Sequence, residues 1–133
     1  MLGFRAALEQ HGCELPDANV RLVGRDLASA TRAAGDLLDD EQRPTAIFAH
    51  DDLFASGVLG AARRRKIQVP DELAVVGFDD SELAEHLELT SVRQPFEESG
   101  QVATEMLLAQ LRDPKRSLQE VTLKLTLIER ATT

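Results

Sequence analysis

The amino-acid sequence predicts an α/β fold, in which helices flank a parallel sheet. Two apolar stretches, residues 45–50 and 73–78, have the continuous hydrophobic character of buried parallel strands. Each is followed by a segment with apolar residues at helical spacing. Strands that alternate with helices over roughly 20–30 residues specify a parallel sheet with right-handed crossovers. The end of the chain breaks this alternation, which predicts a helix and a strand in a different part of the architecture.

The first part of the chain is expected to hold a helix, a strand and a second helix. Residues 2–11 place apolar side chains at helical spacing and stop at Gly12, a residue typical of helix C-caps. Residues 20–23 carry Val and Leu side chains and predict a short strand. Residues 28–38 predict the second helix, and a polar loop connects it to the buried strand at 45–50.

The middle of the chain repeats the strand–helix unit. A helix is expected over residues 52–66, directly after the strand at 45–50. Pro70 disfavours helix at the residue before it, so a turn leads into the strand at 73–78. A short helix is then expected at residues 81–87.

The C-terminal part is of a different kind. An extended link at residues 90–96 contains Pro95 and precedes a long amphipathic helix over residues 97–113. Residues 120–130 alternate apolar and polar side chains, as a half-exposed strand does. That strand is therefore expected at a sheet edge or in another sheet.

Composition and charge disfavour several classes of function. The chain has 133 residues, 43% of them hydrophobic, and a formal net charge of −8. An acidic chain does not suit sequence-independent binding to phosphate backbones. The basic run at residues 63–66 instead matches the negative end of the helix that it closes. The single cysteine, Cys13, cannot form an internal disulfide and fits a reducing compartment.

Membrane insertion and secretion are not expected. No apolar stretch reaches the length of about 20 residues that a membrane-spanning helix needs. The first residues form an amphipathic pattern and lack the apolar core of a signal peptide. We therefore expect a soluble cytoplasmic protein with no membrane partner.

Two pairs of aspartates each follow a buried strand. In an open parallel sheet, ligands bind beyond the carboxyl ends of the strands, beside the helices that follow. One carboxylate of each pair is expected to cap the next helix, namely Asp52 in the first pair and Asp80, or Ser81, in the second. The others, Asp51 and Asp79, would face one crevice, where carboxylates accept hydrogen bonds from ligand hydroxyl groups.

A metal-dependent enzyme is the competing interpretation of these carboxylates. Two carboxylates at strand ends can hold Mg²⁺, and an aspartate at such a position can accept a phosphoryl group. That chemistry usually also needs a lysine or hydroxyl residue at another strand end. The sequence has no lysine there and no phosphate-binding loop or zinc-protease motif. We therefore expect no catalytic residues, no metal and no cofactor, although the enzyme alternative stays open.

Several motifs resemble one family when taken together. They are "RPTAIFAHDDLFASGVL", "VPDELAVVGFDD", "LTSVRQPF" and the closing "IERATT". In this order and spacing they resemble the effector-binding region of LacI/GalR-type transcription repressors. The resemblance implies the C-terminal lobe of a fold related to periplasmic binding proteins. Residues 1–93 would form that lobe, and residues 94–133 a helix and strand that cross toward a second lobe and return.

The resemblance also implies an effector site. Asp79 matches the aspartate that binds sugar hydroxyl groups or other effectors. Asp51 occupies a position where the family commonly has a polar residue that contacts the effector. Phe96 matches a residue that lines the pocket, and Gln94 lies on the crossover between lobes. The position that stacks on a sugar ring falls near Arg25, although no aromatic residue is present there. A sugar-like small molecule is the implied effector.

The sequence contains only part of what the family's members contain. It contains no helix-turn-helix headpiece and lacks most of the second lobe and the first strand of this one. We therefore expect no direct DNA contact from these residues. The apolar residues of 102–107 and 121–127 would lack their usual partners, which predicts a homodimer or a higher assembly. Exchange of the C-terminal helix and strand between chains is one way to form it. A fragment of a solute-binding protein is the other open alternative.

Overall fold

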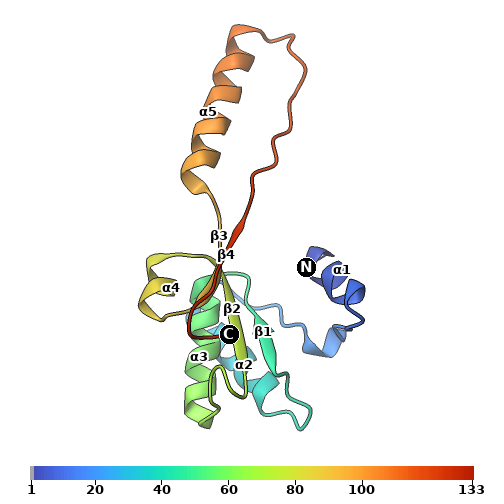
Figure 1. The fold of residues 1–133 in the computed structure, drawn as a ribbon, viewed down its shortest axis with the longest axis vertical. Helices are drawn as coiled ribbons and strands as arrows, with labels where there is room; N and C mark the ends of the chain where they lie inside the picture. Colours follow the sequence, from blue (N-terminus) through green and yellow to red (C-terminus); the bar gives the residue numbers. More distant parts are fainter. Residues whose placement is uncertain (1) are drawn as a thin grey trace.

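The computed structural model describes residues 2–133 and contains one mostly parallel sheet (Figure 1). Its strands lie in the order β1-β2-β3-β4, with the first three parallel and β4 antiparallel to β3. Their bounds are β1 Ala46–Phe48, β2 Ala74–Asp79, β3 Thr90–Arg93 and β4 Thr126–Ile128. The predicted fold class, a parallel α/β sheet flanked by helices, is confirmed.

In the part of the chain that the structure describes, five α-helices and one short 3-10 helix accompany the sheet. Their bounds are α1 Leu2–Gln10, η1 Asp17–Asn19, α2 Leu27–Leu38, α3 Asp52–Arg65, α4 Glu82–His86 and α5 Phe96–Arg112. The five α-helices agree with the predicted ones to within a few residues, whereas the 3-10 helix was not predicted. Among residues 2–133, no helix is both long and apolar enough to cross a membrane.

The core lies between the sheet and the helices α2 and α3. Its buried residues are small and aliphatic, among them Ala34, Leu38, Ala55, Val58, Ala61, Leu73, Val75 and Leu89. Small side chains allow α2 and α3 to pack closely. At Gly57 of α3, a Cβ atom would lie only 3.1 Å from the Cβ of Ala30 and from the backbone of Thr31 in α2. This close approach explains why the core contains so much alanine and glycine.

Local signals define the ends of α1, α2 and α3. The carboxylate of Asp26 accepts a hydrogen bond of 2.8 Å from the Ser29 N–H and caps α2. Gly12 has a φ of 70°, and the Cys13 N–H donates to the Leu8 carbonyl, so α1 closes at its predicted C-cap. The arginines in the last turn of α3 lie at the negative end of that helix.

Three strand predictions are wrong in whole or in part. Residues 20–23 form no strand, because the segment pairs with no neighbour in the described chain, and Leu22 is 94% exposed. The apolar stretch at 45–50 gives an edge strand, not a buried one, since β1 pairs on one side only. Of residues 120–130, only Thr126–Ile128 pair with β3; the rest extends without a partner strand.

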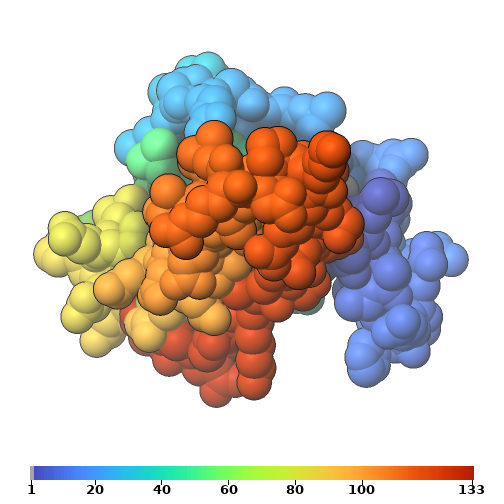
Figure 2. Space-filling view, turned by 90° about the horizontal axis from the view of Figure 1, so that it is seen from above, coloured from blue at the N-terminus to red at the C-terminus, as the bar shows by residue number. Residues whose placement is uncertain are grey.

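Helix α5 and residues 113–125, which we call the arm, project away from the other elements, which we call the body (Figure 1). Figure 2 looks along the arm onto the body, with α1 and α4 on opposite sides. Every residue of α5 is at least partly exposed. Large apolar side chains on the arm face solvent, including Leu107 at 60%, Leu111 at 68% and Leu118 at 90% exposure.

Helix α1 touches the sheet through aromatic rings. Phe4 stacks on Phe48 of β1, with ring centroids 5.3 Å apart, and Phe48 meets Phe78 of β2 edge-on at 6.3 Å. Helix α1 has no fully buried residue. It is therefore held mainly by this aromatic contact at the edge of the sheet.

Candidate functional site

A pocket of about 540 Å³ lies where β2 and β3 end and the arm begins. This is the carboxyl end of the parallel strands, where ligands bind in open α/β sheets. Its lining residues come from the turn after β2, the end of β3 and the first turns of α5: Asp79, Asp80, Arg93, Gln94, Pro95, Phe96, Glu97, Glu98 and Gln101.

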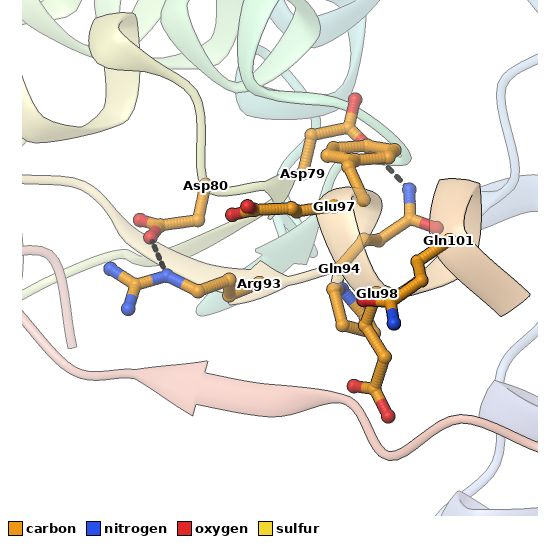
Figure 3. Close-up of a pocket in the computed structure, with 9 residues that line it drawn as sticks. Asp79, Asp80, Arg93, Gln94, Glu97, Glu98 and Gln101 are labelled. Carbon is orange, nitrogen blue, oxygen red and sulfur yellow. Dashed lines mark hydrogen bonds and ion pairs between the residues drawn. The ribbon is translucent and has the colours of Figure 1, made fainter.

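Three of the five residues predicted for the site lie together in this pocket. The Gln94 side-chain amide donates a hydrogen bond of 2.6 Å to Oδ1 of Asp79 (Figure 3). Phe96, the first residue of α5, lines the same pocket and is 61% exposed. The pocket therefore offers a carboxylate, an amide and an aromatic face within one short stretch of the fold.

The other two predicted site residues lie outside the pocket lining. Asp51 precedes α3, and its Oδ1 accepts a hydrogen bond of 2.7 Å from the Phe54 N–H. Asp51 is therefore the N-cap, and the prediction that Asp52 has this role is wrong. Arg25 lies in the exposed segment before α2. Arg25 does not line the pocket, and the aromatic ring in the pocket lining is that of Phe96.

Asp52 instead joins three parts of the fold. The residue is 2% exposed, and its Oδ2 accepts from the backbone N–H of Ser81 at 2.7 Å and from the Ser81 hydroxyl at 2.8 Å. Its Oδ1 accepts from the Ser91 hydroxyl at 2.6 Å. Gly77 of β2 leaves room for this carboxylate, because a Cβ there would lie 2.4 Å from Oδ1 of Asp52. Asp52 therefore ties the start of α3 to the turn after β2 and to β3.

One of the two predicted alternatives was that Asp80 caps α4. This alternative is wrong. The Asp80 side chain is 3% exposed; Oδ2 accepts from Nε of Arg93 at 2.6 Å and Oδ1 from Nη1 of Arg130 at 2.7 Å. Ser81 stands at the N-cap position, but its hydroxyl donates to Asp52 rather than bonding to the helix. Figure 3 shows Asp80 and Arg93 pointing toward each other at one side of the pocket.

The charge state of Asp80 follows from these contacts. Burial raises the pKa of the carboxyl, but the ion pairs with Arg130 and Arg93 outweigh it, and the net pKa lies below the ordinary value of 3.8. Asp80 is therefore ionised at neutral pH and holds both guanidinium groups. Sequence reasoning missed this role; the arginine in the closing "IERATT" was the only signal for it.

The backbone of the turn after β2 is unusual. Asp79 has a φ of 102° and Asp80 a φ of 55°, so two successive residues with Cβ atoms lie in the left-handed region. Such conformations carry strain and persist where surrounding contacts fix them. Here they direct the Asp79 carboxylate to Gln94 and the Asp80 carboxylate to the arginines.

The chemistry available in the pocket is polar recognition. Asp79 accepts hydrogen bonds, the Gln94 amide can donate and accept them, and Phe96 presents an apolar ring. Within residues 2–133, no group of three or more His, Cys, Asp and Glu side chains is arranged to hold a metal ion. The carboxylate, the amide and the ring together suit a ligand that carries hydroxyl groups.

A family of known domains matches the chain over its whole length. The match is to the periplasmic binding protein-like domain and covers residues 1–133. The chain belongs to this family.

Curated relatives are transcription regulators. The chain is 34% identical over 130 residues to the ribose operon repressor of Escherichia coli (strain K12), and 37% identical over 133 residues to the HTH-type transcriptional regulator DegA of Bacillus subtilis (strain 168). The alignments cover 96% and 98% of this chain but 39% of each relative. The chain thus spans well under half the length of the curated relatives that it matches.

Solved structures give the same result. A transcriptional regulator CelR–cellobiose complex has a TM-score of 0.90 and 32% identity, covering 98% of this chain and 41% of that one. A LacI-family regulatory protein from Chloroflexus aggregans has a TM-score of 0.89 and 30% identity, covering 98% and 48%. These neighbours and the curated relatives confirm the resemblance to LacI/GalR-type regulators.

Proposed function

We propose that this chain is the effector-binding and dimerisation portion of a LacI-type transcription regulator. The observation that carries the proposal is the meeting of Asp79, Gln94 and Phe96 in one pocket at the carboxyl end of β2 and β3. The family membership and the repressor relatives support it. In this proposal the pocket is one half of an effector site, and the arm forms its rim.

The proposed effector is a sugar or another small polyol. The Asp79 Oδ1 atom is engaged by Gln94, so its second oxygen is the acceptor available to a ligand hydroxyl. Phe96 supplies an exposed ring on which the apolar face of a sugar can pack. Asp51 and Arg25 do not line this pocket, and the effector contacts expected of them stay predictions.

The proposal also covers assembly and location. Residues 1–93 form the lobe, and residues 94–133 form the crossover helix and the returning strand, which ends in pairing with β3. A homodimer, with exchanged C-terminal elements, is the proposed assembly, since the arm exposes Leu107, Leu111 and Leu118. The chain is proposed to act in the cytoplasm without catalysis, cofactor or direct DNA contact. The relatives are regulators, so neither a solute-binding fragment nor a metal enzyme is proposed.

Calorimetric titration with D-ribose and with cellobiose tests the proposal, these being the sugars named for the relatives. We expect saturable binding of a sugar by the parent chain, and an affinity reduced by about tenfold or more in Asp79→Asn, because a charged hydrogen bond becomes a neutral one. Asp71→Asn, in an exposed turn outside the pocket lining, is the control with the same charge change. Equal affinities for the two variants would contradict the proposed role of Asp79.

A further inference from the structure

One carboxylate joins the two chain segments at the base of the arm. Arg93 is the last residue of β3, from which the chain leaves the body, and Arg130 lies just after β4, by which it returns. Both guanidinium groups donate to Asp80, at 2.6 Å and 2.7 Å. Nη1 of Arg130 also donates to the Leu89 carbonyl at 2.8 Å, which fixes this side chain before β3 begins. Asp80 is therefore the single point to which both segments are attached by charge.

The same carboxylate belongs to the left-handed turn after β2. The Asp80 N–H donates to the Ser91 hydroxyl at 3.1 Å, and the next residue is held by Asp52 through the Ser81 N–H. With the two ion pairs, these bonds fix a backbone conformation that residues with a Cβ atom seldom adopt. This conformation sets the direction of the neighbouring Asp79 carboxylate, which points to Gln94 in the pocket (Figure 3).

We propose that Asp80 is a positioning residue that clamps the base of the arm through Arg93 and Arg130 and, through the same turn, orients Asp79 for its ligand. The part that concerns the ligand rests on the effector role proposed for Asp79; the clamp on the arm does not. The geometry explains why the second aspartate of the pair is buried and ionised, whereas helix capping would leave it at the surface.

The clamp differs from ordinary surface ion pairs in the burial of its carboxylate. Asp39 also receives two hydrogen bonds from one guanidinium, that of Arg65, but its side chain is 64% exposed. Exposed pairs are screened and contribute little. The Asp80 side chain is 3% exposed, so removal of its charge leaves Arg130, itself 18% exposed, without its buried partner. Asp80→Asn and Asp39→Asn therefore form a matched pair of variants with equal changes in charge and size.

The arm position can be measured by distances between two spin labels. Cys13, the free and exposed cysteine, is first replaced by serine, and labels are attached at cysteines introduced for Asp71 in the body and Lys115 in the arm. Asparagine tolerates the left-handed region, so Asp80→Asn tests the charge rather than the backbone. We expect the distance distribution to broaden and shift in Asp80→Asn and to stay at the parent value in Asp39→Asn. An unchanged distribution in Asp80→Asn overturns the clamp.

Two further variants keep the test decisive if Asp80→Asn loses its native circular dichroism. Arg93→Gln and Arg130→Gln each remove one half of the clamp and leave Asp80 in place. Each is expected to broaden the distribution of label distances relative to the parent. Arg130→Lys keeps the charge, so its distribution should be narrower than that of Arg130→Gln. Parent-like distributions in both glutamine variants overturn the proposal. Rescue by lysine separates a charge clamp from a packing role of the arginine side chain.

A titration with D-ribose separates this inference from the proposed function. If the parent binds ribose, we expect the affinity to fall by about tenfold in Asp80→Asn, because a misdirected Asp79 loses a charged hydrogen bond. Full affinity in a variant whose arm is released overturns the orienting role. If ribose and cellobiose both fail to bind the parent, the proposed effector role of Asp79 is wrong. The distances between the spin labels, measured without ligand, then test the clamp by themselves.

Discussion

The carboxylate of Asp52 accepts a hydrogen bond of 2.6 Å from the buried hydroxyl of Ser91, and this contact joins the first turn of α3 to the middle of β3. The second oxygen of Asp52 holds the turn after β2 through Ser81. Three elements that are far apart in the sequence thus meet at one buried acidic group, which binds the residue next to Asp80 of the candidate effector pocket.

Replacement of Asp52 is expected to destabilise the fold. Asp52→Ala leaves the buried Ser91 hydroxyl and two partly buried donors of Ser81 without their acceptor. Buried donors without a partner cost about 1–3 kcal/mol, so we expect the free energy of unfolding to fall by about 3 kcal/mol. Urea unfolding should show a lower midpoint with an unchanged m-value. A change equal to that of Asp71→Ala, at an exposed site, would show that the network is not needed.

Gly77 is expected to tolerate no side chain. A Cβ atom there would lie 2.4 Å from Oδ1 of Asp52 and 2.8 Å from a methyl carbon of Leu89. Overpacking of this kind costs about 1–3 kcal/mol, so Gly77→Ala should lower the urea midpoint. Gly100 in α5 meets no atom within 4 Å, and Gly100→Ala should raise the stability of that helix by up to about 1 kcal/mol. Equal effects of the two substitutions would contradict the close packing around Gly77.

The sequence predicted the order of helices and strands because periodicity and capping are local properties. Gly12 ends α1 as predicted, whereas the Asp26 cap of α2 was not predicted. The strand predicted at 20–23 failed because a strand needs a partner, and pairing is not encoded in the segment itself. The Val and Leu pattern of residues 20–23 does not show whether another strand lies beside them.

Only part of the candidate site was predicted, because a sequence displays local motifs but not tertiary contacts. Asp79, Gln94 and Phe96 were identified from motifs that lie close together in the sequence, and they share one pocket. Within each aspartate pair, the choice of the capping residue depended on side-chain directions that a sequence does not display. The partner of Asp80 fifty residues away, Arg130, is a tertiary contact and was missed.

Acid should weaken the fold through Asp80. The ion pairs hold the folded pKa of this carboxyl below its ordinary value of 3.8, so its stabilising contribution is complete above the unfolded pKa and is lost as pH falls through the folded one. Asp80→Asn should therefore be less stable than the parent by about 1–3 kcal/mol at neutral pH. The difference should vanish at the acid end of a series of urea titrations. A deficit that is independent of pH would assign the effect to packing instead of charge.

Thr132 is expected to fix the end of the chain. Its hydroxyl donates to the Val75 carbonyl at 2.7 Å and accepts from the Thr90 N–H at 2.9 Å, and its carbonyl accepts from the Val75 N–H. Thr132→Val removes the hydroxyl and leaves two buried backbone groups unpaired, which should cost about 2 kcal/mol. Thr132→Ser keeps the hydroxyl and should cost less. Hydrogen exchange at Thr90, fast in the valine variant only, would identify the lost bond as the cause.

The arm supplies the prediction about assembly. Leu107 and Leu111 are one helical turn apart on α5 and are 60% and 68% exposed, so they form a continuous apolar stripe. If two chains bury this stripe against each other, Leu111→Glu should place a charge in the interface and lower the association constant by about tenfold or more. Light scattering during size exclusion, over a concentration series, measures this directly. Gln42→Glu adds the same charge to an exposed loop of the body and should leave the mass unchanged. A parent chain that stays monomeric throughout the series would mean that the stripe does not join two copies, and the exchanged dimer would have to be abandoned.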